Sequence, residues 1–269
     1  MSTAEALKYT VEAYNLSHAS ENKIHDDTIA QQLGFTGGLV PGVEVFAYAT
    51  HPTVAHWGAE FLKRGRMQCR FAKPVYDGRM AEIAGQAVDG NALEITVESD
   101  GVLCATGRAE LPKTKSAAPN PNDYVSSVPP TDRPLATEES LAVGTVLCIA
   151  PDVLTKDIAD QYLADVREKS HVYSELGLAH PGWLLRLCNL ALKDNVLLPP
   201  WIHVGSDIQF FSHAKVGEAL SVRSTVTYNY ERKGHRFVDM DCLVLADDTR
   251  PVAQVKHTAI YQLRHMAVS

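Results

Sequence analysis

The chain is short of several features that would define a function class. None of its apolar runs approaches the ~20 residues needed to cross a bilayer, and no secretory signal is recognisable. A net charge of −7 without any basic stripe disfavours a nucleic-acid partner. No histidines have the spacing of a metal site. The cysteines are odd in number and form no CxxC pair: Cys69, Cys104, Cys148, Cys188 and Cys242. We therefore expect a cytoplasmic protein without disulfides, metal, membrane span or bound nucleic acid.

The composition is that of a soluble globular protein, with 45% hydrophobic and 21% charged residues. One segment differs: residues 112–134 are rich in proline, serine and asparagine and lack apolar periodicity. This composition predicts a linker. We expect an N-terminal domain over 1–112, a linker over 113–139 and a C-terminal domain over 140–269.

The two halves of the sequence repeat each other. Pro41-Gly42 precedes one apolar helix and Pro181-Gly182 precedes another, a shift of about 140 residues. Phe71 and Gly78 correspond to Phe210 and Gly217. In each half a loop, one long apolar helix and a run of alternating segments follow in that order, which predicts an α+β fold built twice.

Strands are predicted from alternation and from tight turn signals, and helices from apolar periodicity. The predicted helices cover 43–58, 156–166 and 183–192, and 171–177 is predicted as a loop. The predicted strands cover 9–16, 66–71, 80–88, 93–99, 102–111, 146–149, 202–211, 219–231, 236–246 and 251–263.

The segment 17–42 carries the most specific pattern. Asp27 stands just before a short amphipathic run and is predicted to be its helix N-cap, and Gly34 is predicted to end that helix. A glycine-rich turn then leads through Gly38 to Gly42 at the start of the apolar helix. Free backbone N–H groups at such a helix start are suited to stabilising a developing oxyanion.

These residues resemble a known family. The pattern Asn22-x-x-His25-x-Asp27-x-x-Ala30-x-x-x-Gly34-Phe35, followed by Leu39-Val40-Pro41-Gly42, is similar to the catalytic loop of MaoC-type (R)-specific enoyl-CoA hydratases. The resemblance implies a double hotdog fold, in which each half wraps a curved antiparallel sheet around one long helix. The chain departs from the family at two positions: Ser20 replaces the catalytic aspartate, and Pro41 replaces the histidine before the glycine.

The resemblance also implies roles for individual residues. His25 would be the acid/base, Asn22 would orient the water or the imidazole, and Gly42, with Gly38 and Val43 beside it, would hold the thioester oxygen. Thr50 matches a position that braces the loop in the family.

Ser20 cannot act as a base at neutral pH, so another carboxylate is needed if the two-residue mechanism of the family is kept. Glu21 and Asp26 are the two candidates, although Asp26 is favoured as a solvated residue. Alternatively, His25 acts alone, or the reaction is a different one.

The function implied is that of an enoyl-CoA hydratase or 3-hydroxyacyl-CoA dehydratase, a hydro-lyase of fatty acid metabolism. The acyl-CoA is the substrate, so CoA enters with it and no separate cofactor is expected. The degenerate motif of the second half suggests a bulky acyl group, and the family suggests a homo-oligomer, a dimer of double hotdogs. Two alternatives remain open: an acyl-CoA thioesterase using Glu44 on the central helix, and a non-catalytic acyl-CoA-binding subunit of a hydratase complex.

Overall fold

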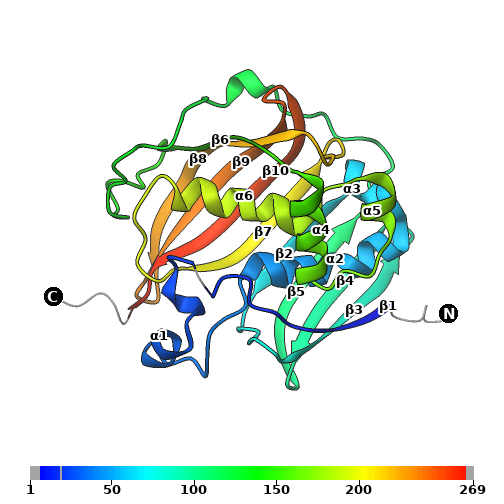
Figure 1. Cartoon of the computed structure of the whole chain (residues 1–269), viewed down its shortest axis with the longest axis horizontal. Helices are drawn as coiled ribbons and strands as arrows, with labels where there is room; N and C mark the ends of the chain where they lie inside the picture. Colours follow the sequence, from blue (N-terminus) through cyan, green and yellow to red (C-terminus); the bar gives the residue numbers. More distant parts are fainter. Residues whose placement is uncertain (1–6, 19, 265–269) are drawn as a thin grey trace.

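A computed structural model describes residues 7–18 and 20–264. Ten strands form one antiparallel sheet in the order β1-β3-β4-β5-β2-β7-β10-β9-β8-β6 (Figure 1). The strands are β1 (Leu7–Glu12), β2 (Arg66–Phe71), β3 (Met80–Asp89), β4 (Ala92–Ser99), β5 (Val102–Glu110), β6 (Val146–Val153), β7 (Ile202–Phe210), β8 (Ala219–Arg232), β9 (His235–Ala246) and β10 (Arg250–Gln262).

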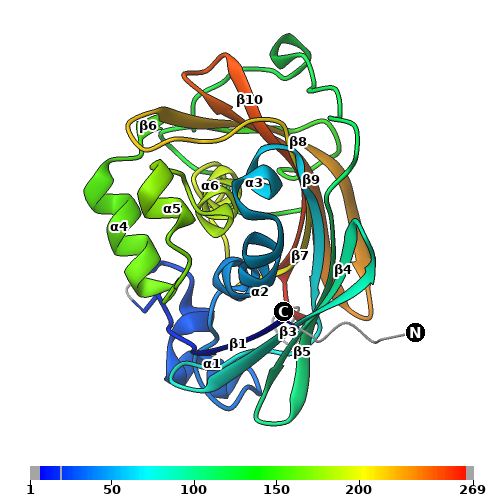
Figure 2. The same ribbon diagram turned by 90° about the vertical axis from the view of Figure 1, so that its right-hand side faces the viewer.

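Two long helices lie inside the curve of this sheet. Figure 2 shows α2 (Gly42–Trp57) and α6 (Pro181–Lys193) side by side against the sheet, with α4 (Lys156–Asp165) and α5 (Val172–Leu176) on their other side. Both long helices carry mostly buried side chains because they pack on the sheet and on each other. The short elements are α1 (Asp27–Gln32), α3 (Phe61–Arg64) and the 3₁₀ turns η1 (Lys23–His25), η2 (Gly58–Glu60) and η3 (Pro121–Asp123).

The sheet is continuous across the two halves of the chain. Strand β2 of the first half pairs with β7 of the second, and Met67 stands opposite Ile208, both buried. At the exposed side of the same junction, Arg66 Nε donates to Asp207 Oδ1 over 2.9 Å. The internal repeat is visible in the backbone as well, because Gly78 and Gly217 both adopt positive φ, +70° and +92°.

Most predicted elements form near their predicted bounds. Strand β2 matches its prediction at both ends, and helices α2, α4 and α6 lie where they were expected. The prediction of a loop over 171–177 is wrong, because α5 forms there and ends at Gly177 in the left-handed conformation. The proline-rich segment contains η3 as its only regular element and runs across the outside of the second half (Figure 1).

The cysteines and the apolar helices were also considered from the sequence. All five cysteines are buried and free. Among the described helices, none is long and apolar enough to span a bilayer.

Candidate active site

The loop before α2 is held by two neighbouring aspartates. Asp26 is the N-cap of α1, since its side chain accepts from the Ile29 N–H over 3.0 Å. Asp27, predicted to be that cap, is instead the first helical residue and accepts from the Gly38 N–H over 2.7 Å. Asp26 is exposed to solvent, as predicted, and Gly34 ends the helix as expected, with φ +89°.

This loop from the first half packs on the second half of the chain. Its apolar side chains form a separate cluster with the ends of β7 and β10, comprising Ile24, Ala30, Leu39, Ile260 and Leu263, with Ile202, Val204 and Phe237 packed against them. The position of His25 is thus set by strands that are more than 170 residues away in the sequence.

His25 is held as a neutral imidazole. Its Nδ1 lies 2.6 Å from the Leu39 carbonyl oxygen, so Nδ1 carries the hydrogen and donates it, leaving the lone pair on Nε2. Burial lowers the pKa of His25 to about 4, partly offset by the Leu39 hydrogen bond, and the positive charge of Arg186 lowers it further. At neutral pH, His25 can therefore accept a proton but has none to give at Nε2.

Asn22 faces this lone pair and is itself fixed by the second half. Its Nδ2 donates to the Trp201 carbonyl over 2.9 Å and its Oδ1 accepts from the Trp201 N–H over 3.2 Å. The amide orientation is thereby set, and Nδ2 lies 3.3 Å from His25 Nε2. Since an N–H group points at Nε2, the arrangement favours the unprotonated ring, and the contact is long enough to be exchanged for another donor.

The two remaining loop residues expected at the site lie elsewhere. The Ser20 hydroxyl donates to the Asn22 carbonyl over 3.2 Å and so braces the loop. Glu21 is exposed and paired with Arg133 in the linker, which lowers its pKa. The structure shows neither side chain hydrogen-bonded to His25.

The start of α2 offers free backbone donors. Pro41 is its N-cap and supplies no side-chain cap, and no described residue accepts a hydrogen bond from the N–H of Gly42 or Val43. The other two expected residues differ. Gly38 uses its N–H on Asp27, and Thr50 donates back to the Phe46 carbonyl of its own helix over 2.8 Å rather than to the loop.

A buried polar chain behind Gly42 was not predicted. His203 Nε2 lies 3.1 Å from the Gly205 carbonyl and 2.8 Å from Ser206 Oγ, and Ser206 Oγ lies 2.9 Å from His257 Nδ1. His203 Nε2 must carry the hydrogen because a carbonyl can only accept, so its Nδ1 holds a lone pair for which no described residue provides a donor.

The hydrogen-bonded side chains of His203, Ser206 and His257 leave room only for glycine at position 42. A Cβ on Gly42 would lie 2.8 Å from His203 Nδ1 and 3.0 Å from the His203 carbonyl oxygen. Burial lowers the pKa of His203 to about 3. The sequence offered only isolated histidines on strands, and no spacing could reveal that β7 and β10 bring them together.

Glu44, in the first turn of α2, is completely buried and pairs with Arg186 of α6. Arg186 Nη1 donates to Glu44 Oε1 over 2.6 Å, while Glu44 Oε2 has no donor among the described residues. Burial raises the pKa of Glu44, against the lowering effect of Arg186.

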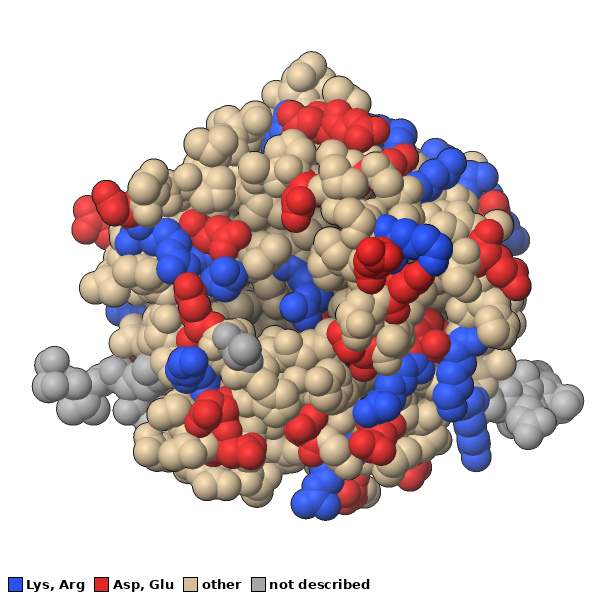
Figure 3. Space-filling model, in the orientation of Figure 1, with Lys and Arg blue, Asp and Glu red and all other residues tan. Residues whose placement is uncertain are grey.

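Arg186 reaches from this pair to a cavity of about 420 Å³ lined by Tyr14, Leu16, Asp157, Ile158, Gln161, Tyr162, Asp165, Trp183 and Arg186. On the face shown in Figure 3, acidic and basic side chains are interspersed, and basic side chains lie inside a central hollow.

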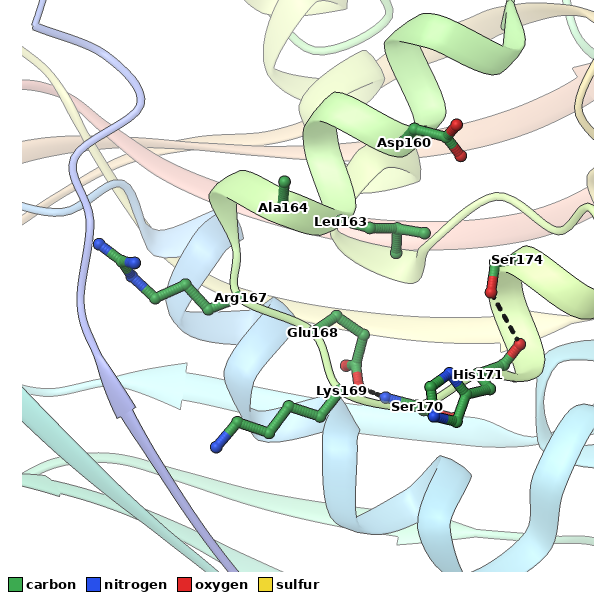
Figure 4. Close-up of a pocket in the computed structure, with 9 residues that line it drawn as sticks. All are labelled: Asp160, Leu163, Ala164, Arg167, Glu168, Lys169, Ser170, His171 and Ser174. Atoms are coloured by element: carbon green, nitrogen blue, oxygen red, sulfur yellow. Dashed lines mark hydrogen bonds between the residues drawn. The ribbon is translucent and has the colours of Figure 1, made fainter.

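A second cavity, of about 710 Å³, lies between α4 and the loop that follows it. In Figure 4 the side chains of Arg167 and Lys169 point to one side of this loop and His171 to the other. Glu168 accepts from His51 Nδ1 over 2.6 Å and from His180 Nε2 over 3.4 Å. Burial opposes its ionisation, but these two hydrogen bonds outweigh burial and lower the pKa of Glu168.

No metal site is formed by residues 7–18 and 20–264, because no group of three or more His, Cys, Asp or Glu side chains there is arranged to hold an ion.

Comparison with known proteins gives structural matches only. No family model and no curated protein matches the sequence. A MaoC domain protein dehydratase, so named provisionally, from Chloroflexus aurantiacus superposes with a TM-score of 0.66 at 12% identity, over 98% of this chain and 96% of that one. A conserved hypothetical protein from Mycobacterium tuberculosis, described as a double hotdog, gives 0.64 at 15% identity over 97% and 96%. The chain has the double hotdog fold.

The thioesterases of this fold are also represented. A thioesterase II, again so named provisionally, from Thermobifida fusca superposes with a TM-score of 0.52 at 17% identity, over 96% of this chain and 97% of that one.

Within the double hotdog, the candidate site is composite: the first half contributes the loop and the start of α2, and the second contributes Trp201, His203 and Arg186.

Proposed function

We propose that the protein catalyses the reversible hydration of a trans-2-enoyl-CoA to a 3-hydroxyacyl-CoA. One observation carries the proposal: His25 is kept neutral, with its lone pair on Nε2, in the loop that leads to the free N–H groups of Gly42 and Val43. A base beside an oxyanion-binding helix start is what addition of water to an enoyl thioester needs. The match to a MaoC domain dehydratase supports the same reaction class.

The site supports a mechanism with one base. His25 Nε2 takes a proton from water as the water oxygen bonds to C3, and the C2=C3 electrons move onto the thioester as an enolate. The N–H groups of Gly42 and Val43 stabilise the enolate oxygen. The imidazolium of His25 then returns its proton to C2, so the ring ends neutral as it began. This route uses neither Ser20 nor Glu21.

Asn22 helps to keep His25 Nε2 unprotonated, so that this nitrogen accepts the proton from water. Because its amide is fixed by Trp201, it keeps a donor on Nε2 until a water molecule replaces it. A water that donates to Nε2 is then oriented for attack on C3.

The test is hydration of short, long, branched and aromatic trans-2-enoyl-CoAs by the wild type and by His25→Gln. We expect kcat/KM to fall by roughly 100-fold or more in the variant, the usual contribution of a general base. His56→Gln changes an exposed histidine near the end of α2; it serves as the control and should leave the rate unchanged. Equal activity of His25→Gln and wild type would refute the mechanism.

The same assay separates the alternatives. Release of free thiol from acyl-CoA would indicate a thioesterase, but Glu44 is fully buried and bonded to Arg186, so it has no access to water in this conformation. Binding of acyl-CoA without turnover of any of the substrates would indicate a binding subunit.

A further inference from the structure

Arg186 is the side chain whose environment says most about the substrate. One of its N–H groups is bonded to Glu44, and no other hydrogen bond from its guanidinium to a described residue is found. Its side chain is 30% exposed, whereas that of Glu44 is 0% exposed. The guanidinium is therefore anchored on one side by a buried carboxylate and has uncommitted donors on the side that lines the cavity.

The rest of this cavity is aromatic and apolar near Arg186. Trp183 and Tyr162 lie on the α4 and α6 side, and Tyr14 and Leu16 come from the segment that leads into the His25 loop. The Arg186 guanidinium lies 6.0 Å from the centre of the Tyr162 ring. Aromatic walls beside a guanidinium with uncommitted donors suit a ring or branched group that carries an acceptor.

The charges of the cavity exclude an anionic acceptor. Glu44 already neutralises Arg186, and Asp157 and Asp165 also line the walls. Burial opposes the charge on Arg186, but its pKa is raised chiefly by Glu44 and to a smaller extent by Asp165. A carboxylate entering this cavity would meet an excess of negative charge, while an uncharged oxygen could accept from Arg186 without that repulsion.

Arg186 also links the cavity to the start of α2. Its partner Glu44 lies in the first turn of that helix, two residues after Gly42. We infer that this cavity binds the distal part of the acyl group and that Arg186 selects an acyl group bearing an uncharged hydroxyl or carbonyl oxygen on a bulky, ring-like body. The inference rests on the proposed hydration at His25 and names the substrate class for it.

Three matched thioesters test this inference: cinnamoyl-CoA, 4-hydroxycinnamoyl-CoA and 4-carboxycinnamoyl-CoA. They differ only in a hydrogen, a neutral oxygen or an anion at the distal end. For the wild type we expect kcat/KM for the hydroxy compound to exceed that for cinnamoyl-CoA about tenfold, as one hydrogen bond to a charged donor allows. The carboxy compound should be the poorest substrate.

Variants then assign the preference to Arg186. In Arg186→Met the ratio between the hydroxy compound and cinnamoyl-CoA should fall to about one, through KM rather than kcat. Because this change leaves Glu44 buried without its partner, the double variant Glu44→Gln/Arg186→Met is measured as well and should show the same ratio. Arg232→Met, which removes an exposed charge at the end of β8, should retain the wild-type ratio.

Failure of the inference differs from failure of the proposed function. Hydration of all three compounds without preference, or a preference that survives in the double variant, would overturn the inference and leave hydration at His25 intact. Dissociation constants of the saturated analogues, 3-phenylpropanoyl-CoA and 3-(4-hydroxyphenyl)propanoyl-CoA, are measured in parallel. An Arg186-dependent preference in binding without any hydration would retain the cavity assignment and reject the reaction.

Discussion

The protonation of His25 is decided by its neighbours rather than by solvent. The ring donates from Nδ1 to Leu39 and meets an N–H of Asn22 at Nε2, and burial adds to this by lowering its pKa to about 4. A histidine of this kind works as a base over the whole physiological range. The absence of a carboxylate partner at Ser20 is consistent with that role, because a nearby anion would raise the pKa.

Asn22→Asp should change the protonation of His25. Placing a carboxylate beside Nε2 should raise the pKa of His25 by at least about 1 unit, since an opposite charge at this distance favours the protonated ring. The imidazole signal of His25 in an NMR pH titration reports this directly. In the wild type the same titration should show its midpoint near pH 4. An unchanged midpoint in the variant would show that Asn22 does not control the ring.

The buried histidines also predict how stability depends on pH. His25 and His203 have folded pKa values lowered to about 4 and about 3, and burial also lowers that of His257. In the unfolded chain each of these histidines binds its proton near pH 6.5, whereas in the folded chain it does so only at lower pH. The free energy of unfolding is therefore highest above pH 6.5 and falls as the pH drops toward 4. Each group contributes a slope of up to about 1.4 kcal/mol per pH unit in that window.

Urea unfolding at pH 7, 6 and 5 measures this slope. We expect the free energy of unfolding to fall steadily across the series. His56→Gln, a change to an exposed histidine, should follow the wild-type curve. A constant free energy of unfolding from pH 7 to 5 would mean that these rings bind protons as readily in the folded as in the unfolded chain.

At the scale of elements, the site depends on how closely α2 and α6 approach. Gly182, at the start of α6, has no room for a side chain: a Cβ there would lie 2.8 Å from Ala47 Cβ and 3.1 Å from the Val43 carbonyl, and would overlap the Tyr162 hydroxyl. Because the helices are this close, Arg186 of α6 can donate a hydrogen bond to Glu44 of α2. The two helix starts that repeat in the sequence therefore meet in space.

Gly182→Ala should destabilise the protein by about 1–3 kcal/mol, the usual cost of overpacking. Gly90→Ala is the control, because a Cβ there meets no atom within 4 Å. Thermal or urea unfolding of the two variants gives the comparison. If Gly182→Ala proved as stable as Gly90→Ala, the helix contact would be looser than described.

At the scale of the whole molecule, the two halves share both a sheet and a site. Pairing of β2 with β7 joins the sheets, the His25 loop packs on β7 and β10, and α2 packs on α6. Each half therefore buries apolar surface of the other. Despite the linker between them, the halves are not expected to behave as separate folding units.

We therefore predict a single cooperative unfolding transition. Tryptophan fluorescence, far-ultraviolet circular dichroism and calorimetry should give coincident midpoints, and the calorimetric and van't Hoff enthalpies should agree. A variant retaining only Trp57 reports on the first half and one retaining only Trp201 on the second. Two separated transitions in these variants would show that the halves unfold independently.

The local structure and the repeat follow from the sequence alone. Alternation placed β2 between Arg66 and Phe71, and the paired Pro-Gly motifs located the starts of α2 and α6. The loop motif singled out Asn22 and His25, which the structure brings within 3.3 Å of each other. These features rest on periodicity, turn chemistry and short spacing, all of which lie within a few residues of one another.

Which distant groups complete the site depends on how the two halves pack together. Glu21 is one candidate for the missing carboxylate by its position in the loop, but its side chain turns outward to Arg133, while Trp201 orients Asn22 and Arg186 fixes Glu44. These partners lie between about 110 and 180 residues apart in the chain. Their meeting depends on the pairing of β2 with β7 and on the crossing of α2 and α6, and no local pattern in the sequence encodes either contact.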